Sequence, residues 1–158
     1  YLRQTPDISS AIFDINFRSP WELQRLAGRD VQKMGGVVIN MSSVASVMPN
    51  KAQTLYGASK AALNHATINT PVETNGKLRA VALALGPVNT AMWAEVPDSF
   101  KEVVLAGMES GEPLSLESVA AGVRKAIRSE RSGVIVHHND GLWTPPAGDE
   151  HHIDISEL

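Results

Sequence analysis

The sequence predicts an α/β fold in which strands and helices alternate around a parallel sheet. Three short apolar runs, at residues 37–41, 78–85 and 133–137, have the length and composition of strands buried on both faces. Longer segments with helical spacing of apolar residues separate these runs. Because strand–helix–strand units place their strands parallel, this alternation predicts a parallel sheet with helices packed against it.

The first element, residues 7–34, is expected to be helical. Apolar side chains recur in it at near-helical spacing, and Asp7 can cap its start. Pro20 lacks an amide hydrogen, and its ring collides with the preceding turn. We therefore expect the helix to be disturbed near Asn16. Two glycines follow the helix and end it.

The second helix follows a polar loop. Residues 42–55 are expected to form that loop, and residues 56–70 the helix. Pro71 comes next, and a proline in a helix interior costs about 3 kcal/mol. The helix is therefore expected to bend or stop near Asn69.

The C-terminal half supplies the remaining elements. A strand, two helices and a strand are expected at residues 78–85, 99–108, 116–127 and 133–137. In the last helix Ser115 or Ser118 can serve as the cap, and Val119, Val123 and Ile127 form an apolar stripe.

Composition limits the possible functions. With 158 residues, 43% of them hydrophobic, the chain is long enough to bury a core. A net charge of −3 without a basic run argues against a nucleic-acid partner. The absence of cysteine excludes disulfides and thiolate chemistry, and no stretch approaches the ~20 apolar residues of a membrane span. We expect a cytoplasmic protein with a domain at residues 1–144 and a flexible tail, rich in Pro, Gly and acidic residues, at residues 145–158.

Four polar residues have spacings that suggest catalysis. Ser43 lies 13 residues before Tyr56, and Asn16 lies 27 residues before Ser43. On a helix, Tyr56 and Lys60 would lie one turn apart on the same face. A free phenol titrates at about pH 10, but a neighbouring ammonium stabilises the phenolate, so such a tyrosine can exchange a proton near neutral pH. Ser43 is expected to orient a substrate oxygen.

Each of these residues also has an ordinary structural interpretation. A tyrosine and a lysine four residues apart can be a surface pair on a helix. Ser42 and Ser46 compete with Ser43 for the role of the reactive hydroxyl. An asparagine within a helix, such as Asn16, is often solvated or a cap.

The order and spacing of these residues resemble the short-chain dehydrogenase/reductase family. Residues 37–43 resemble the strand that delivers the family's catalytic serine. Residues 56–64, YGASKAALN, resemble the start of its catalytic helix, and residues 85–90, LGPVNT, are similar to its PGxVxT segment beside the nicotinamide. The resemblance is specific over residues 12–90 and generic over residues 91–142.

The resemblance implies a partial Rossmann-like, doubly wound parallel sheet and hydride transfer between NAD or NADP and a secondary alcohol or ketone. Tyr56 would give or take the hydroxyl proton, and Lys60 would bind the nicotinamide ribose. Ser43 would hold the substrate oxygen, and Asn16 would position a water that links Lys60 to solvent. The residues that the resemblance places at the cofactor are Met41, Tyr56, Lys60, Gly86, Pro87, Val88 and Thr90. Thr90 can also cap the helix after it.

Two residues depart from the family pattern. Leu85 replaces the usual proline before Gly86, which makes that turn less rigid. Pro71 falls where the catalytic helix normally continues. In the family this helix and the one carrying Asn16 form much of the dimer interface, so Pro71 bears on the oligomer more than on the chemistry. The resemblance makes a homo-oligomer of the intact enzyme possible.

The glycine-rich turn that cradles the pyrophosphate in this family is absent from the sequence. Gly35 and Gly36 precede a strand, which is the wrong order for that role. The chain is therefore expected to be the C-terminal part of a longer enzyme. The choice between NAD and NADP stays open, because it rests on charge near the adenosine ribose.

Other functions stay open at this stage. The chain can be a catalytically incompetent fragment that acts as a binding or interaction module or has no function, and its sheet would then have an unpaired edge. It can also be an epimerase, isomerase or dehydratase, because extended members of the family share the YxxxK pattern.

Two further groups of residues remain to be placed. His137-His138 and His151-His152 suggest metal ligands, but adjacent residues of a strand point to opposite faces, so we expect no metal site. In the family that the chain resembles, the region that corresponds to residues 92–100 forms a lid over the substrate. Here Met92, Trp93 and Phe100 are expected to belong either to such an apolar lid, which would suit an apolar alcohol or ketone, or to a surface helix with core contacts.

Overall fold

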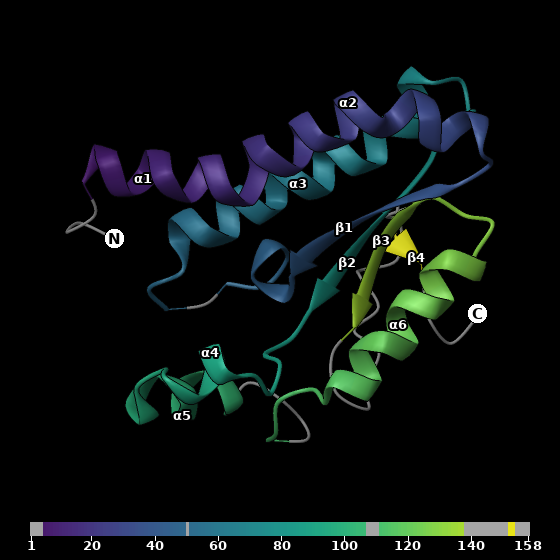
Figure 1. Cartoon of the computed structure of the whole chain (residues 1–158). Coiled ribbons are helices and arrows are strands. Elements are labelled where there is room, and N and C mark those ends of the chain that lie inside the picture. Colours follow the sequence, from purple (N-terminus) through teal and green to yellow (C-terminus); the bar gives the residue numbers. More distant parts are fainter. Residues whose placement is uncertain (1–4, 50, 107–110, 138–151, 154–158) are drawn as a thin grey trace.

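The computed structural model describes residues 5–49, 51–106, 111–137 and 152–153. A parallel sheet lies between two layers of helices, which confirms the predicted α/β class and parallel sheet (Figure 1). The strands lie in sequence order: β1 (Val37–Ser43), β2 (Arg79–Leu85), β3 (Gly133–His137) and β4 (His152–Ile153). β4 belongs to the segment predicted to be a tail, and the rest of that segment lies outside the described residues.

One long helical segment opens the described chain. Its three parts follow one another without a break: α1 (Pro6–Phe13), the π-helix η1 (Asp14–Arg18) and α2 (Ser19–Lys33). The side chain of Thr5 accepts a hydrogen bond from the Ile8 amide at 3.4 Å, so Thr5 is the N-cap and the prediction of Asp7 was wrong. Asp7 instead lies in the first turn, where the helix dipole favours a negative charge.

The π-helix η1 confirms the disturbance predicted near Asn16. Pro20 has no amide hydrogen to donate to the Asn16 carbonyl four residues back. The amide of Ser19 instead donates five residues back to the Asp14 carbonyl, and the Ser19 hydroxyl donates to the same oxygen at 2.7 Å. This wider turn places Asn16 at the middle of the bulge.

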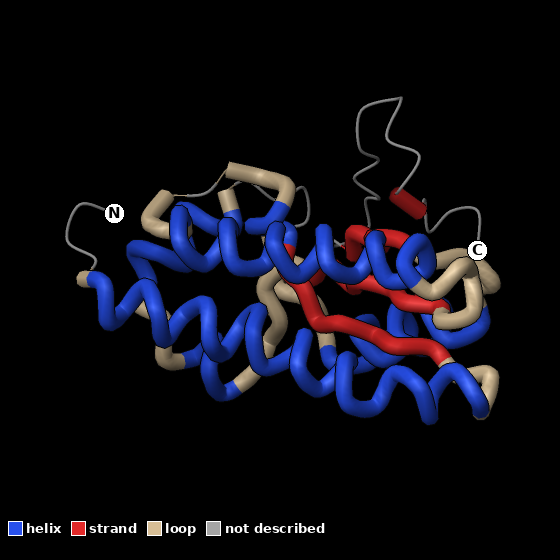
Figure 2. Tube along the Cα trace, turned by 90° about the horizontal axis from the view of Figure 1, so that it is seen from above, coloured by secondary structure: helices blue, strands red, loops and turns tan. Residues whose placement is uncertain are grey.

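The helix α3 (Thr54–Glu73) lies beside α1 and α2 on one face of the sheet (Figures 1 and 2). Of the predicted bend or stop near Asn69, the stop was wrong, because the helix continues past Pro71 to Glu73. Pro71 stands in the last turn, where it removes a single backbone hydrogen bond. The helix then ends at Thr74, whose amide donates to the Thr70 carbonyl at 3.1 Å.

The other helices lie at the carboxyl ends of the strands and on the opposite face of the sheet (Figure 1). They are the 3-10 turn η2 (Val44–Ser46), α4 (Ala91–Ala94), α5 (Asp98–Leu105) and α6 (Leu116–Arg128). Ser115, one of the two predicted caps, accepts from the Ser118 amide at 3.0 Å. Val119 and Val123 pack against the core as predicted, but Ile127 is 51% exposed, and Ala126 takes the buried position instead.

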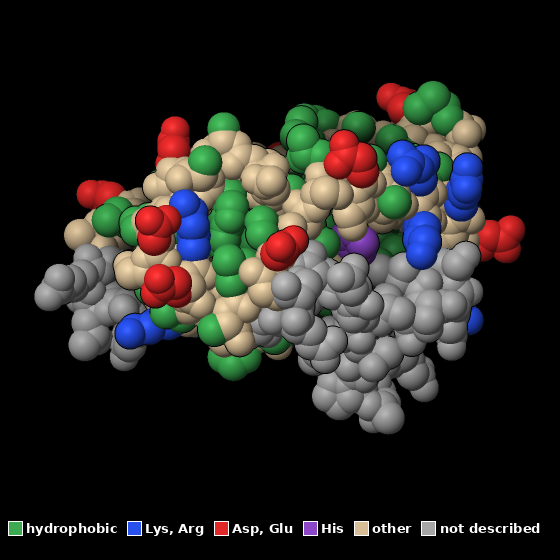
Figure 3. Space-filling model, turned by 90° about the horizontal axis from the view of Figure 1, so that it is seen from below, with side chains coloured by type: hydrophobic (Ala, Val, Ile, Leu, Met, Phe, Trp, Pro, Cys, Tyr) green, Lys and Arg blue, Asp and Glu red, His purple; other side chains and the backbone are tan. Residues whose placement is uncertain are grey.

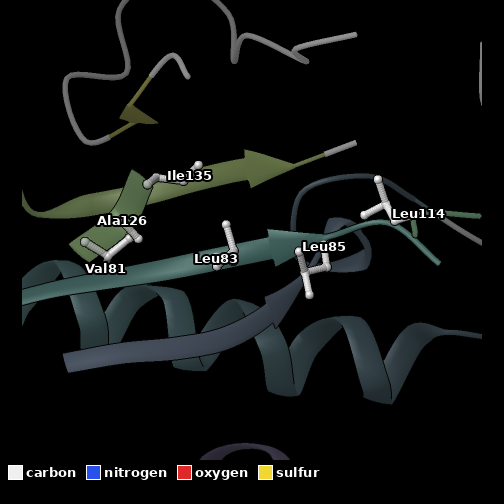
Figure 4. Packing of buried hydrophobic residues seen from close by; sticks show 6 residues of the cluster. All are labelled: Val81, Leu83, Leu85, Leu114, Ala126 and Ile135. Carbon is white, nitrogen blue, oxygen red and sulfur yellow. The ribbon is translucent and has the colours of Figure 1, made fainter. Parts of the chain in front are cut away.

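The buried core consists of two clusters, one on each face of β2, because successive side chains of a strand point to opposite faces. Figure 4 shows the cluster between the sheet and α6, with residues Val81, Leu83, Leu85, Leu114, Ala126 and Ile135. The cluster on the α3 side contains Val44, Ala82, Ala84, Val134 and Val136. Its small alanines let the backbone of α3 approach the sheet closely. No helix among the described residues has both the length and the apolar character needed to cross a membrane.

Candidate active site

An open cavity of about 510 Å³ lies at the carboxyl ends of β1 and β2. Ligands of open parallel sheets bind in the crevice at this edge. The residues that line the cavity come from β1, the start of α3, the segment after β2 and the α4–α5 region: Ser42, Ser43, Val44, Gln53, Tyr56, Leu85, Gly86, Pro87, Val88, Thr90, Met92, Trp93, Val96, Phe100 and Val104. Figure 3 shows hydrophobic side chains gathered in a hollow on the lower face of the molecule.

Ser43 ends β1 with its hydroxyl oriented by the turn that follows. The Ser43 Oγ accepts a hydrogen bond from the Ala45 amide at 3.2 Å, which leaves its own proton free to donate. Ser42 donates to the Lys60 carbonyl at 3.5 Å, and Ser46 donates to the Ser43 carbonyl at 2.5 Å. Of the three competing serines, Ser43 is therefore the one that lines the cavity with an uncommitted hydroxyl proton.

Tyr56 and Lys60 lie one turn apart on α3, as the spacing predicted. The Lys60 Nζ is 5.9 Å from the centre of the Tyr56 ring, which is within cation–π range. The same Nζ donates to the Met41 carbonyl on β1 at 2.8 Å, and burial lowers the pKa of Lys60. The Tyr56 side chain lines the cavity, and its hydroxyl has no hydrogen-bond partner in the described part of the chain.

Asn16 is not brought into the cavity. It lies half-buried in η1, which packs against α3. Within the described ranges, no direct hydrogen bond links it to Lys60. The structure thus brings together Ser43, Tyr56 and Lys60, and leaves Asn16 on the next helix.

The segment after β2 is fixed from two sides. The amide of Gly86 donates to the His137 carbonyl at 3.0 Å. Leu114 donates from its amide to the Pro87 carbonyl at 2.7 Å and accepts from the Asn89 amide at 2.9 Å. These bonds hold the backbone of Gly86, Pro87 and Val88 against the cavity even though Leu85 replaces the family's proline.

Thr90 is the last residue of this segment and directly precedes α4. Its side chain accepts from the Trp93 amide at 3.3 Å, so it caps α4, as the capping interpretation predicted. The α4–α5 region contributes apolar side chains to the cavity wall, among them Trp93 and Phe100. The region therefore forms part of the cavity wall, and its role as a lid stays a prediction.

Close packing between α3 and η2 holds the turn that follows Ser43 in place. A Cβ on Gly57 would lie 2.5 Å from the Ala45 carbonyl oxygen, so the two backbones approach more closely than a side chain allows. On the next turns of α3, the buried Asn64 donates to the Ser46 hydroxyl at 2.8 Å, and Ser46 in turn donates to the Ser43 carbonyl. Sequence reasoning missed this relay from α3 to Ser43.

A second polar network was also missed. Asn40, which is 7% exposed, donates to Gln24 Oε1 at 3.0 Å and to Thr67 Oγ1 at 2.8 Å. Gln24 also donates to Thr70 Oγ1 at 2.5 Å. The network joins β1 to α2 and α3 three residues before Ser43. By joining β1 to both helices, the network fixes the position of the end of β1, where Ser43 lies.

His137 belongs to the structural support of the cavity segment. Its Nε2 lies 2.9 Å from the Ser118 hydroxyl and 3.1 Å from the Ser118 carbonyl, and burial lowers its pKa. In the described ranges no group of three acidic, His or Cys residues can hold a metal ion. His138 and His151, which suggested a metal, lie outside those ranges.

Comparison with known proteins identifies the family. The family model for short chain dehydrogenases matches residues 3–100. The chain belongs to this family. It is 29% identical to the 3-oxoacyl-[acyl-carrier-protein] reductase FabG of Thermotoga maritima over 89% of the chain and 59% of that protein. It is 31% identical to a tropinone reductase homolog of Arabidopsis thaliana over 89% of the chain and 55% of that protein.

One further relative and two solved structures are also similar to this chain. A benzil reductase of Saccharomyces cerevisiae is 36% identical over 56% of the chain and 35% of that protein. The ketoreductase LanV with bound NADP has a TM-score of 0.72, with 20% identity over 85% of this chain and 53% of that one. The acetoin dehydrogenase of Enterobacter cloacae has a TM-score of 0.69, with 20% identity over 87% of this chain and 57% of that one. The chain therefore spans between about a third and three fifths of these proteins, and the structures confirm the Rossmann-like fold.

Proposed function

We propose that the protein carrying this chain is an NAD- or NADP-dependent oxidoreductase that interconverts a secondary alcohol and a ketone, with residues 1–144 as its catalytic part. One observation carries the proposal. The hydroxyls of Ser43 and Tyr56 face the same apolar cavity, with the ammonium of Lys60 one turn behind the tyrosine ring. Membership of the dehydrogenase family supports hydride transfer as the reaction at this arrangement of side chains.

The proton chemistry of ketone reduction follows from these three side chains. The Ser43 hydroxyl donates a hydrogen bond to the carbonyl oxygen and holds it in place. The Tyr56 hydroxyl gives its proton to that oxygen as the alcohol forms, and the nearby Lys60 ammonium stabilises the phenolate that is left. In alcohol oxidation Tyr56 takes the proton back. Apolar side chains such as Trp93 and Phe100 form part of the wall around the developing charges.

The chain carries residues that fit the nicotinamide end of the cofactor. Lys60 places a half-buried cationic donor beside Met41 on β1, whose side chain is 42% exposed. The residues that would hold the nicotinamide and its ribose are Met41, Tyr56, Lys60, Gly86, Pro87, Val88 and Thr90. When bound, the nicotinamide supplies or accepts the hydride. The sequence has no glycine-rich turn for the pyrophosphate, so we expect this chain alone to bind the cofactor weakly.

The second candidate is an interaction module without catalysis. Within the described residues β1 pairs only with β2, so its other edge presents unpaired backbone groups that another strand can bind. This candidate needs neither a cofactor nor the Tyr56 proton.

Calorimetric titration with NADH and NADPH, followed by an activity screen on ketones, separates the two candidates. Both the 158-residue chain and the full product of its gene should be titrated. The oxidoreductase requires that the full product bind at least one cofactor and reduce a ketone with it. A folded full product that binds neither cofactor would favour the interaction module.

A further inference from the structure

Six side chains with hydrogen-bonding groups line the cavity, and their hydrogen bonds divide them into two groups. Ser42 donates to the Lys60 carbonyl, and Thr90 is bonded to the backbone around it, accepting from the Trp93 amide and donating to the Val88 carbonyl at 3.4 Å. Among the described residues, the cavity side chains with protons still free for a ligand are those of Ser43, Tyr56, Gln53 and Trp93.

The proposed chemistry uses neither Gln53 nor Trp93, and of the two only the Gln53 amide can both donate and accept a hydrogen bond. Gln53 stands at the N-cap position of α3, but only its backbone carbonyl is engaged there, accepting from the Gly57 amide at 2.7 Å. Its side chain caps nothing and has no hydrogen-bond partner in the part of the chain that the structure describes. Gln53 lines both this cavity and a second one beside η2, so its half-buried amide, which has no partner, is available to a ligand there.

The position of Gln53 fixes where such a ligand group would lie. Residues 53 and 56 are three apart at the start of a helix, so their side chains lie on one face with Cβ atoms about 5–6 Å apart. Both side chains line the same cavity. An oxygen that the Gln53 amide binds would therefore belong to the part of the substrate next to the oxygen held by Tyr56.

We propose that Gln53 is a specificity-determining residue that binds a second oxygen of the substrate, close to the reacting carbonyl. The substrate class is then an apolar ketone with a neighbouring carbonyl or hydroxyl group, such as a dicarbonyl compound. The amide can donate to a carbonyl or accept from a hydroxyl, so it serves both the ketone and the alcohol form of the substrate. This inference rests on the oxidoreductase function proposed above.

The test compares two substrates that differ in the second carbonyl alone: phenylpropanedione and propiophenone. The full gene product and its Gln53→Leu variant are assayed on both, by the change in cofactor absorbance. Loss of one neutral hydrogen bond should lower kcat/KM for the dione by about tenfold, mainly through KM, and should leave propiophenone within about twofold. Gln53→Glu, which loses the donor amide, should also disfavour the dione. Gln32→Leu, the same change on α2, should affect neither substrate.

The possible results distinguish a failure of the role of Gln53 from a failure of the proposed oxidoreductase function. An equal change on both substrates in Gln53→Leu would overturn the role of Gln53 and leave the oxidoreductase intact. If the wild-type protein binds cofactor but reduces neither ketone, the proposed function falls, and the assignment of Gln53 falls with it.

Discussion

Replacing Asn40 by alanine should lower the free energy of unfolding by about 2–4 kcal/mol. The side chain is buried and donates two hydrogen bonds, to Gln24 Oε1 and Thr67 Oγ1. Each bond contributes roughly 0.5–1.5 kcal/mol, and the void left by the amide adds about 1 kcal/mol. Thr67 keeps its own bond to the Leu63 carbonyl at 2.7 Å, so it is not left without a partner.

Asn40→Asp is the sharper test, because it replaces a donor by an acceptor without changing the shape. The new oxygen would face Gln24 Oε1 at 3.0 Å and Thr67 Oγ1 at 2.8 Å, and the Thr67 proton is already committed. A buried carboxylate without a donor should cost roughly 3–5 kcal/mol at neutral pH. Burial would raise its pKa in the folded protein, so the folded state would bind this proton more tightly. Stability is then lost as pH rises from about 4 through the raised value.

Urea denaturation followed by circular dichroism, at about pH 5 and about pH 8, measures both effects. Relative to wild type, Asn40→Asp should be less stable at pH 8 than at pH 5, whereas the deficit of Asn40→Ala should be the same at both. Asn75→Asp makes the same chemical change at an exposed position and should stay within about 0.5 kcal/mol of wild type. An Asn40→Asp variant as stable as wild type at pH 8 would refute the account of this network.

Three further perturbations follow from the same structure. Ser46→Ala and Asn64→Ala each break the relay to Ser43, and either should lower kcat by about tenfold, while the double variant loses little more in steady-state assays. Leu83→Ala empties a fully buried site and should lower the free energy of unfolding in urea by about 2–5 kcal/mol. Burial lowers the pKa of His137, so the folded state binds its proton more weakly than the unfolded state; stability should fall as pH drops below about 6.5, and His137→Gln should weaken this dependence in thermal melts.

Each of these predictions has a result that contradicts it. If the effects of Ser46→Ala and Asn64→Ala on kcat simply multiply, the two residues do not act through one relay. A loss below about 1 kcal/mol at Leu83 would mean that the α6 side of the sheet is not closely packed. A wild-type melt that does not change between about pH 7.5 and about pH 5.5 would remove His137 as the source of acid sensitivity.

The elements could be predicted from the sequence wherever a single local property decides the structure. The apolar runs specify the strands because buried parallel strands need apolar residues on both faces. Pro20 alone predicts the bulge at Asn16, because a missing amide acts on the turn directly before it. Pro71 was misjudged because its effect depends on how many helical bonds follow it, and here the helix ends two residues later.

The site could be predicted in part. Tyr56 and Lys60 are close in sequence, so helical geometry alone brings them together. The polar links at Asn40 and Asn64 join residues that lie 27 and 18 positions apart and meet only when α3 packs against β1 and η2. Gln53 was missed because its role depends on which neighbours satisfy it, and that is visible only in the folded chain.

Turnover by Tyr56→Phe tests the central claim most directly. The substitution removes the proton that Tyr56 would exchange and keeps the ring in the cavity wall, so cofactor binding should be preserved. In the full gene product, kcat for a ketone should fall by at least about 100-fold, the contribution of a general acid, while the cofactor Kd measured by calorimetry stays within about twofold. Comparable turnover in the phenylalanine variant would exclude Tyr56 from the mechanism and contradict the proposed function of this site.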